Sequence, residues 1–135
     1  MRAIDLIVIH CSSTRENYAL TEQALEASHR LIGFDGTGYH FYVRRDGRVL
    51  ATRPVSKVGA HVRGYNAHSI GICYEGGLDR YGNPKDTRTE WQRHSLSVLV
   101  GKLLQEYPGT CVVGHRDLSP DLNGNGEVRS EEHTS

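Results

Sequence analysis

Two histidines, far apart in the chain, each follow a short apolar run. His10 ends the run IDLIVIH, and His115 ends the run TCVVGH. Runs of this kind predict buried strands, and open α/β sheets bind their ligands where parallel strands end. If the two strands are parallel neighbours, both imidazoles lie at one sheet edge, and neutral imidazole suits zinc. An isolated histidine is more often an ordinary polar residue, so the spacing alone leaves both interpretations open.

The segments around these histidines predict the elements that must position them. Apolar runs predict strands at residues 4–9, 68–77 and 110–115, and Asp46-Gly47 predicts the turn of a hairpin within residues 39–52. Apolar residues at helical spacing, among them Leu25, Leu31 and Ile32, predict a first helix. Trp91, Leu96 and Leu103 predict a second helix, which begins with a capping box formed by Thr89 and Gln92. This order predicts an α/β fold: a single domain over residues 1–135, with a central mixed β-sheet and helices packed on its faces.

Composition excludes several classes of protein. The 135 residues contain 16 basic and 16 acidic side chains, so the basic excess of a nucleic-acid binder is missing. No apolar run approaches the ~20 residues of a membrane span, and the N-terminus lacks the features of a secretory signal, so we expect cytoplasmic synthesis. The 3 cysteines include no CxxC pair, which argues against a disulfide framework. We expect Cys73 and Cys111 to be small buried core residues.

Four motifs in order carry a resemblance to a known family. They are IVIHCSST, GYHFYVRRDGRV, GAHVRGYNAHSIGICYEGG and VVGHRDLSP, and the resemblance runs from about Ile4 to Pro120. These motifs resemble the zinc-dependent N-acetylmuramoyl-L-alanine amidases of the phage-lysozyme type, whose fold also serves the peptidoglycan recognition proteins. The resemblance implies that a zinc-activated water cleaves the amide between N-acetylmuramic acid and the L-alanine of the stem peptide. It also implies an endolysin-like enzyme, expected to be a monomer, that acts on bacterial peptidoglycan after release from the cell.

The resemblance also assigns roles to individual residues. It implies that His10 and His115 are zinc ligands and that Tyr39 is catalytic, because a phenol can donate a hydrogen bond to a developing oxyanion. It nominates three further residues as contacts in, or shaping positions of, the substrate groove: His61, Asn66 and Ser69.

One part of the family pattern is missing from the printed sequence. In the family a lysine and then a cysteine, the third zinc ligand, follow the second histidine, but neither residue type occurs after Pro120. His133 is a candidate replacement, because zinc accepts imidazole as well as thiolate. The alternative is a catalytically inactive peptidoglycan-binding module.

A second cation is suggested by residues 121–132. Their sequence, DLNGNGEVRSEE, fits the calcium-loop pattern D-x-[DN]-x-[DN]-G-x₅-E. Calcium prefers oxygen ligands at such alternating positions, and the expected ligands are Asp121, Asn123, Asn125, the backbone carbonyl of Glu127, and Glu132. The other interpretation is a turn rich in asparagine and glycine.

Overall fold

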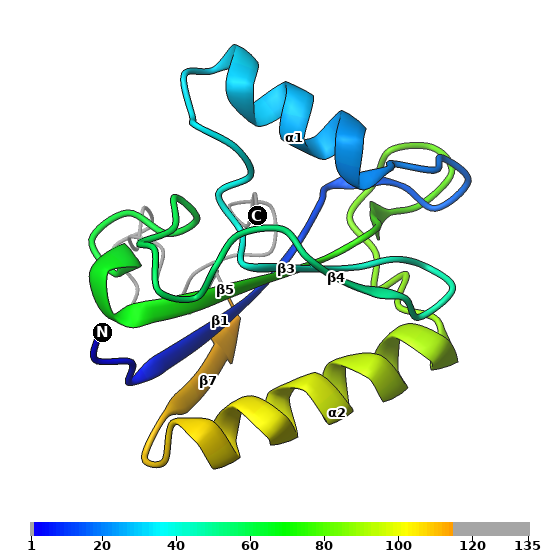
Figure 1. Cartoon of the computed structure of the whole chain (residues 1–135). Coiled ribbons are helices and arrows are strands. Elements are labelled where there is room, and N and C mark those ends of the chain that lie inside the picture. Colours follow the sequence, from blue (N-terminus) through cyan, green and yellow to red (C-terminus); the bar gives the residue numbers. More distant parts are fainter. Residues whose placement is uncertain (1, 115–135) are drawn as a thin grey trace, which may run out of the picture.

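The structure is a computed structural model that describes residues 2–114 (Figure 1). His115, His133 and the calcium-type loop at 121–132 therefore lie outside the described residues. The elements in chain order are β1 Leu6–Cys11, β2 Thr14–Arg15, α1 Glu22–Leu31, β3 Phe41–Val43, β4 Val49–Ala51, the 3₁₀ helix η1 Asn66–His68, β5 Ser69–Tyr74, β6 Gly77–Leu78, α2 Glu90–Glu106 and β7 Cys111–Gly114.

A five-stranded mixed sheet forms the centre of the fold, with strand order β4-β3-β5-β1-β7. Only the β3–β4 hairpin is antiparallel among these pairs, and β1 pairs in parallel with both β5 and β7. Figure 1 shows α1 on one face of the sheet and α2 on the other. The predicted mixed sheet with helices on its faces is confirmed.

The two faces of the sheet bury different kinds of side chain. On the α2 face, Ile7, Ile70 and Ile72 pack against Leu96 and Leu103 in an aliphatic core. Because side chains alternate along a strand, His10 shares the opposite face with Leu6 and Val8. That second face is the one covered by α1, and it carries the polar site described below.

Helix starts follow the predicted capping chemistry. The Thr89 side chain accepts a hydrogen bond from the N–H of Gln92, and the Gln92 side chain accepts one from the N–H of Thr89, which completes the predicted capping box. Thr21 caps α1 in the simpler way, through the N–H of Ala24. These local bonds satisfy backbone donors that have no partner within the helix.

Several predicted core positions are wrong. Leu31 is 88%, Ile32 is 69% and Trp91 is 68% exposed, so these apolar residues of the predicted helices do not join the core. Cys73 is buried as predicted, but Cys111 is exposed, because β7 is an edge strand. None of the helices among the described residues has both the length and the apolar character needed to cross a bilayer.

Candidate functional site

His10 lies inside β1, one residue before the strand ends, and not beyond the end as the sequence suggested. The ring is fully buried on the α1 face of the sheet. In the sheet register His10 is opposite Cys73 of β5. A histidine at this depth needs polar partners, because burying an unsatisfied imidazole is costly.

His61 supplies one of those partners. Its Nδ1 lies 2.9 Å from Nε2 of His10, and the two rings meet edge to face, with centroids 5.0 Å apart. On the other side of the His61 ring, Nε2 lies 3.1 Å from the hydroxyl oxygen of Ser69. The two histidines are 51 residues apart in sequence. A chain of three polar side chains, Ser69–His61–His10, therefore links β5 and β1 through His61, which lies in the segment that connects β4 to η1.

The position of the His61 ring is fixed by its surroundings. The side-chain oxygen of Asn66 accepts hydrogen bonds from the backbone N–H groups of His61, at 3.0 Å, and Val62, at 2.9 Å. The ring lies against Gly71, where a Cβ atom would come within 2.6–2.8 Å of three ring atoms. Asn66, Ser69 and Gly71 thus hold His61, which explains in part why a GAHVRGYNAHSIG segment would need these residue types.

The Tyr39 ring also lies beside His10. The ring centroids of the two residues are 5.1 Å apart. Burial, together with the neighbouring thiols of Cys73 and Cys11, raises the pKa of Tyr39 well above its usual value. The phenol stays protonated near neutral pH, and its hydroxyl is hydrogen-bonded to the Cys73 side chain. The resemblance implied that Tyr39 lies near the metal that His10 binds, and the structure places the two rings side by side. The catalytic role of Tyr39 stays a prediction.

His29 supports Tyr39 from α1, a role that the sequence did not predict. Its Nδ1 accepts a hydrogen bond of 2.8 Å from the N–H of Gly38, and its ring lies 5.4 Å from that of Tyr39. Burial lowers the pKa of His29, which keeps Nδ1 available as an acceptor. The helical spacing of the sequence did not indicate that His29 contacts the polar site.

For the zinc amidase that the resemblance implies, replacing Tyr39 by phenylalanine is expected to lower turnover about 10²–10³-fold and to leave zinc affinity unchanged. The ring and its packing are kept, while the hydroxyl to which the resemblance assigns oxyanion stabilisation is lost. Steady-state rates on purified peptidoglycan and a chelator competition assay measure the two quantities. An unchanged rate would remove Tyr39 from the chemistry.

His40 is a second buried histidine, beside His61. Its Nδ1 accepts from the N–H of Gly71 at 3.0 Å, and its Nε2 donates to the carbonyl of Lys57 at 2.8 Å, so the ring is neutral with its proton on Nε2. Burial lowers the pKa of His40 from 6.5 to about 4, and the nearby Arg2 guanidinium adds to this effect.

Conformational stability is therefore expected to fall as the pH decreases from about 6.5 toward about 4, the pKa of folded His40. The unfolded chain takes up the proton first, so the His40 contribution is complete above the unfolded pKa and is lost as the pH falls through the folded one. Urea denaturation at several pH values measures it, with His40→Asn as the comparison. The variant should lose less stability on acidification, and an equal loss in both proteins would contradict this account.

Arg2 holds the covering segment in place, and nothing in the sequence marked it. Its guanidinium donates to the backbone carbonyls of Val55, Asn66, Ala67 and Ser69, with nitrogen–oxygen distances between 2.7 and 3.2 Å. These residues flank the stretch that carries His61. Two other histidines lie outside the site: His68 pairs with Asp5 near the surface, and His94 is exposed.

The second predicted metal ligand follows directly after the described residues. Strands β1 and β7 are parallel neighbours, as the sequence argument required, and Ile9 pairs with Gly114. Within residues 2–114, no group of three histidine, cysteine or acidic side chains is arranged to hold a metal ion. A complete metal site would therefore need ligands from outside this part of the chain.

Comparison with known proteins gives one consistent family. The family N-acetylmuramoyl-L-alanine amidase (Amidase_2) matches residues 1–127. The endolysin of Enterobacteria phage K11 is 38% identical over 112 residues, which is 83% of this chain and 74% of that protein.

Two solved structures are similar in fold. The endolysin amidase LysCS from Clostridium intestinale has a TM-score of 0.76 at 33% identity, over 87% of this chain and 72% of that one. The bumblebee peptidoglycan recognition protein SA has a TM-score of 0.75 over 95% of this chain and 80% of that one. Its 22% identity supports the shared fold alone.

Proposed function

Because the chain belongs to the N-acetylmuramoyl-L-alanine amidase family, we propose that His10 and Tyr39 form the described half of its active centre. The protein is a peptidoglycan hydrolase that cleaves the amide between N-acetylmuramic acid and the L-alanine of the stem peptide. The observation that carries the proposal is a buried imidazole beside a protonated phenol, on the strand next to the one that His115 follows. The alternative, a catalytically inactive peptidoglycan-binding module, is not better supported than the hydrolase.

The residues present fit the zinc that this family generally uses. His10 is buried, and its Nε2 is already engaged by His61, so coordination through Nδ1 is compatible with that bond and coordination through Nε2 is not. An imidazole with its second nitrogen hydrogen-bonded is the usual arrangement of a metal-ligating histidine. His10 and His115 would hold the ion, with His133 the candidate third ligand. When bound, zinc supplies a Lewis acid that polarises the scissile carbonyl and activates the attacking water.

The chain's own side chains would supply a hydrogen-bond donor, the Tyr39 phenol, and the residues that position the groups of the site. The Tyr39 phenol is directed by its packing against His10 and His29, and its raised pKa keeps the proton on the oxygen. It would donate to the carbonyl oxygen as negative charge develops there. Asn66 and Ser69 shape the wall of the site through their bonds to the His61 backbone and ring.

The calcium-type loop stays a separate proposal. Residues Asp121, Asn123, Asn125, Glu127 and Glu132 fit the ligand pattern of calcium in sequence, and they lie outside the described residues. Neither the family match nor the similar structures support calcium. Titration of the purified chain with calcium, followed by calorimetry, tests it, and no heat at millimolar calcium would reject it.

Cellular setting follows from the relatives. The endolysins that the chain resembles are phage proteins, so we place this enzyme on the bacterial wall after its release from the cytoplasm. We propose separately that it acts as a monomer. Light scattering of the purified chain tests the monomer, and a dimer mass would contradict it.

Product analysis tests the reaction. Zinc-loaded protein is incubated with purified peptidoglycan, and the soluble products are analysed by mass spectrometry. The expected products are stem peptides with a free L-alanine amino group and glycan strands with intact disaccharides. Cleavage within the glycan or within the peptide would contradict the assignment, and wall binding without any release would favour the inactive module.

A further inference from the structure

We infer that His61 is a positioning residue that holds His10 in the one tautomer able to coordinate a cation through Nδ1. This inference rests on the proposed zinc function and deepens it. The resemblance placed His61 in the wall of the substrate groove, whereas its contacts in the structure are made with His10 and Ser69.

The hydrogen-bond chain can run in only two directions. In the first, the N–H at Nε2 of His10 donates to Nδ1 of His61, and Nε2 of His61 donates to the hydroxyl of Ser69. His10 Nδ1 then presents a lone pair. In the second direction, Nδ1 of His61 donates to His10, and the proton on His10 moves to Nδ1, which blocks coordination. A cation at His10 therefore requires the first direction, in which His61 acts as acceptor.

Steric constraints keep the acceptor in line with His10. A Cβ atom at Gly71 would approach the His61 ring to 2.6 Å, and one at Gly59 would approach it to 2.9 Å. Asn66 fixes the backbone of His61 at the same time. The ring thus has room for one placement, and Nδ1 meets His10 in it. Partners that orient a ligating histidine in this way typically contribute about 10–100-fold to metal affinity.

Three variants, two at His61 and one at Gly71, separate the hydrogen bond from packing. His61→Phe keeps a ring of similar size and removes both nitrogens. His61→Asn places a side-chain oxygen near the position of Nδ1 and keeps an acceptor. Gly71→Ala keeps both nitrogens of His61 but displaces the ring. His94→Ala removes an exposed histidine from α2 and serves as the matched control.

Zinc affinity is measured by competition with a chromophoric chelator, and circular dichroism confirms the fold of each variant. We expect His61→Phe and Gly71→Ala to bind zinc about 10–100-fold more weakly than the unchanged chain, and His61→Asn to recover part of the loss. His94→Ala should match the unchanged chain. Nitrogen-15 spectra of the zinc-loaded protein should show the His10 proton on Nε2.

Two results would overturn the inference. One is a His61→Phe affinity within about twofold of the unchanged chain, below the range expected for such a partner. The other is equal weakening in His61→Phe and His61→Asn, which would assign the effect to packing. If the unchanged chain does not bind zinc at all, the proposed function fails instead, so the two failures are distinguishable.

Discussion

Replacing His10 by alanine is expected to abolish stoichiometric zinc binding and to lower amidase turnover at least about a thousandfold. A metal ion that polarises a carbonyl contributes several kcal/mol to transition-state stabilisation, and each 1.36 kcal/mol is about tenfold in rate. His10 is the one predicted zinc ligand among the described residues, and its Nε2 lies 2.9 Å from Nδ1 of His61. Metal analysis after dialysis and product release from peptidoglycan measure the two effects.

A fold control is essential for this variant, because His10 is completely buried. Removing the ring leaves a small cavity, and Nδ1 of His61 loses its hydrogen-bond partner, so some loss of stability is expected. His10→Asn fills more of the space and serves as a second variant, and His94→Ala controls for removing a histidine. Folded His10 variants that keep turnover would show that the reaction does not use a metal at this residue.

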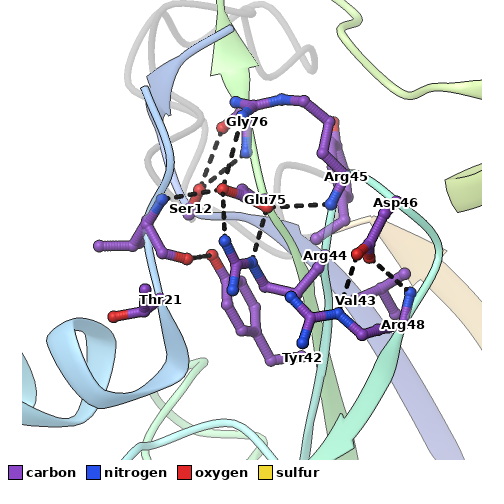
Figure 2. Close-up of polar contacts among 12 residues, drawn as sticks. Ser12, Thr21, Tyr42, Val43, Arg44, Arg45, Asp46, Arg48, Glu75 and Gly76 are labelled. Atoms are coloured by element: carbon purple, nitrogen blue, oxygen red, sulfur yellow. Dashed lines mark hydrogen bonds and ion pairs between the residues drawn. The ribbon is translucent and has the colours of Figure 1, made fainter. Parts of the chain in front are cut away.

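Replacing Glu75 by glutamine is expected to have the largest effect on stability, a loss of about 3–5 kcal/mol. Glu75 is 1% exposed and lies at the end of β5. One carboxylate oxygen accepts from Nε of Arg44 at 2.8 Å and from the N–H of Arg45 at 2.9 Å, while the other accepts from the N–H of Leu20 at 2.8 Å. Figure 2 shows Glu75 between the two arginines.

The carboxylate thus joins the ends of β3 and β5 to the chain that enters α1. Burial by itself raises the pKa of Glu75, but the hydrogen bonds from Arg44, Arg45 and Leu20 outweigh it, and the net pKa is lowered. The charge is therefore retained near neutral pH, and its stabilising contribution is lost as the pH falls through the lowered pKa. Glutamine would leave the buried Arg44 charge without its partner, which is the costly way to break such a pair.

Urea denaturation measures the free energy of unfolding of this variant. The matched control is Asp46→Asn, because Asp46 pairs with Arg48 at the surface, where both side chains are more than half exposed. That pair should contribute less than about 1 kcal/mol. Similar losses in the two variants would contradict the role assigned to the buried carboxylate.

Features encoded by neighbouring residues could be predicted from the sequence. The Asp46-Gly47 turn and the Thr89–Gln92 capping box depend on contacts within a few positions, and both form as expected. The parallel pairing of β1 with β7 was a condition of the histidine argument, and it is met. The placement of Tyr39 beside His10 was reached through resemblance, because no local spacing connects them.

Contacts between distant segments could not be predicted in this way. The bond between His10 and His61 depends on Gly71, which has no side chain and so leaves room for the His61 ring. It also depends on Asn66, whose side-chain oxygen accepts a hydrogen bond from the His61 backbone. Periodicity placed His29 in a helix, but the ring's bond to Gly38 depends on where that helix crosses the sheet. The same limitation explains why the exposure of Trp91 was not predicted, because an apolar stripe does not show which of its residues are buried in the fold.

The central claim is that His10 and a histidine following β7 share one zinc ion. X-ray absorption at the zinc edge of the stoichiometrically loaded chain tests it most directly. The predicted spectrum has at least two imidazole ligands with zinc–nitrogen distances of about 2.0–2.1 Å, reduced by one imidazole in His115→Ala. A spectrum with at most one imidazole, or one left unchanged by His115→Ala, would contradict the claim.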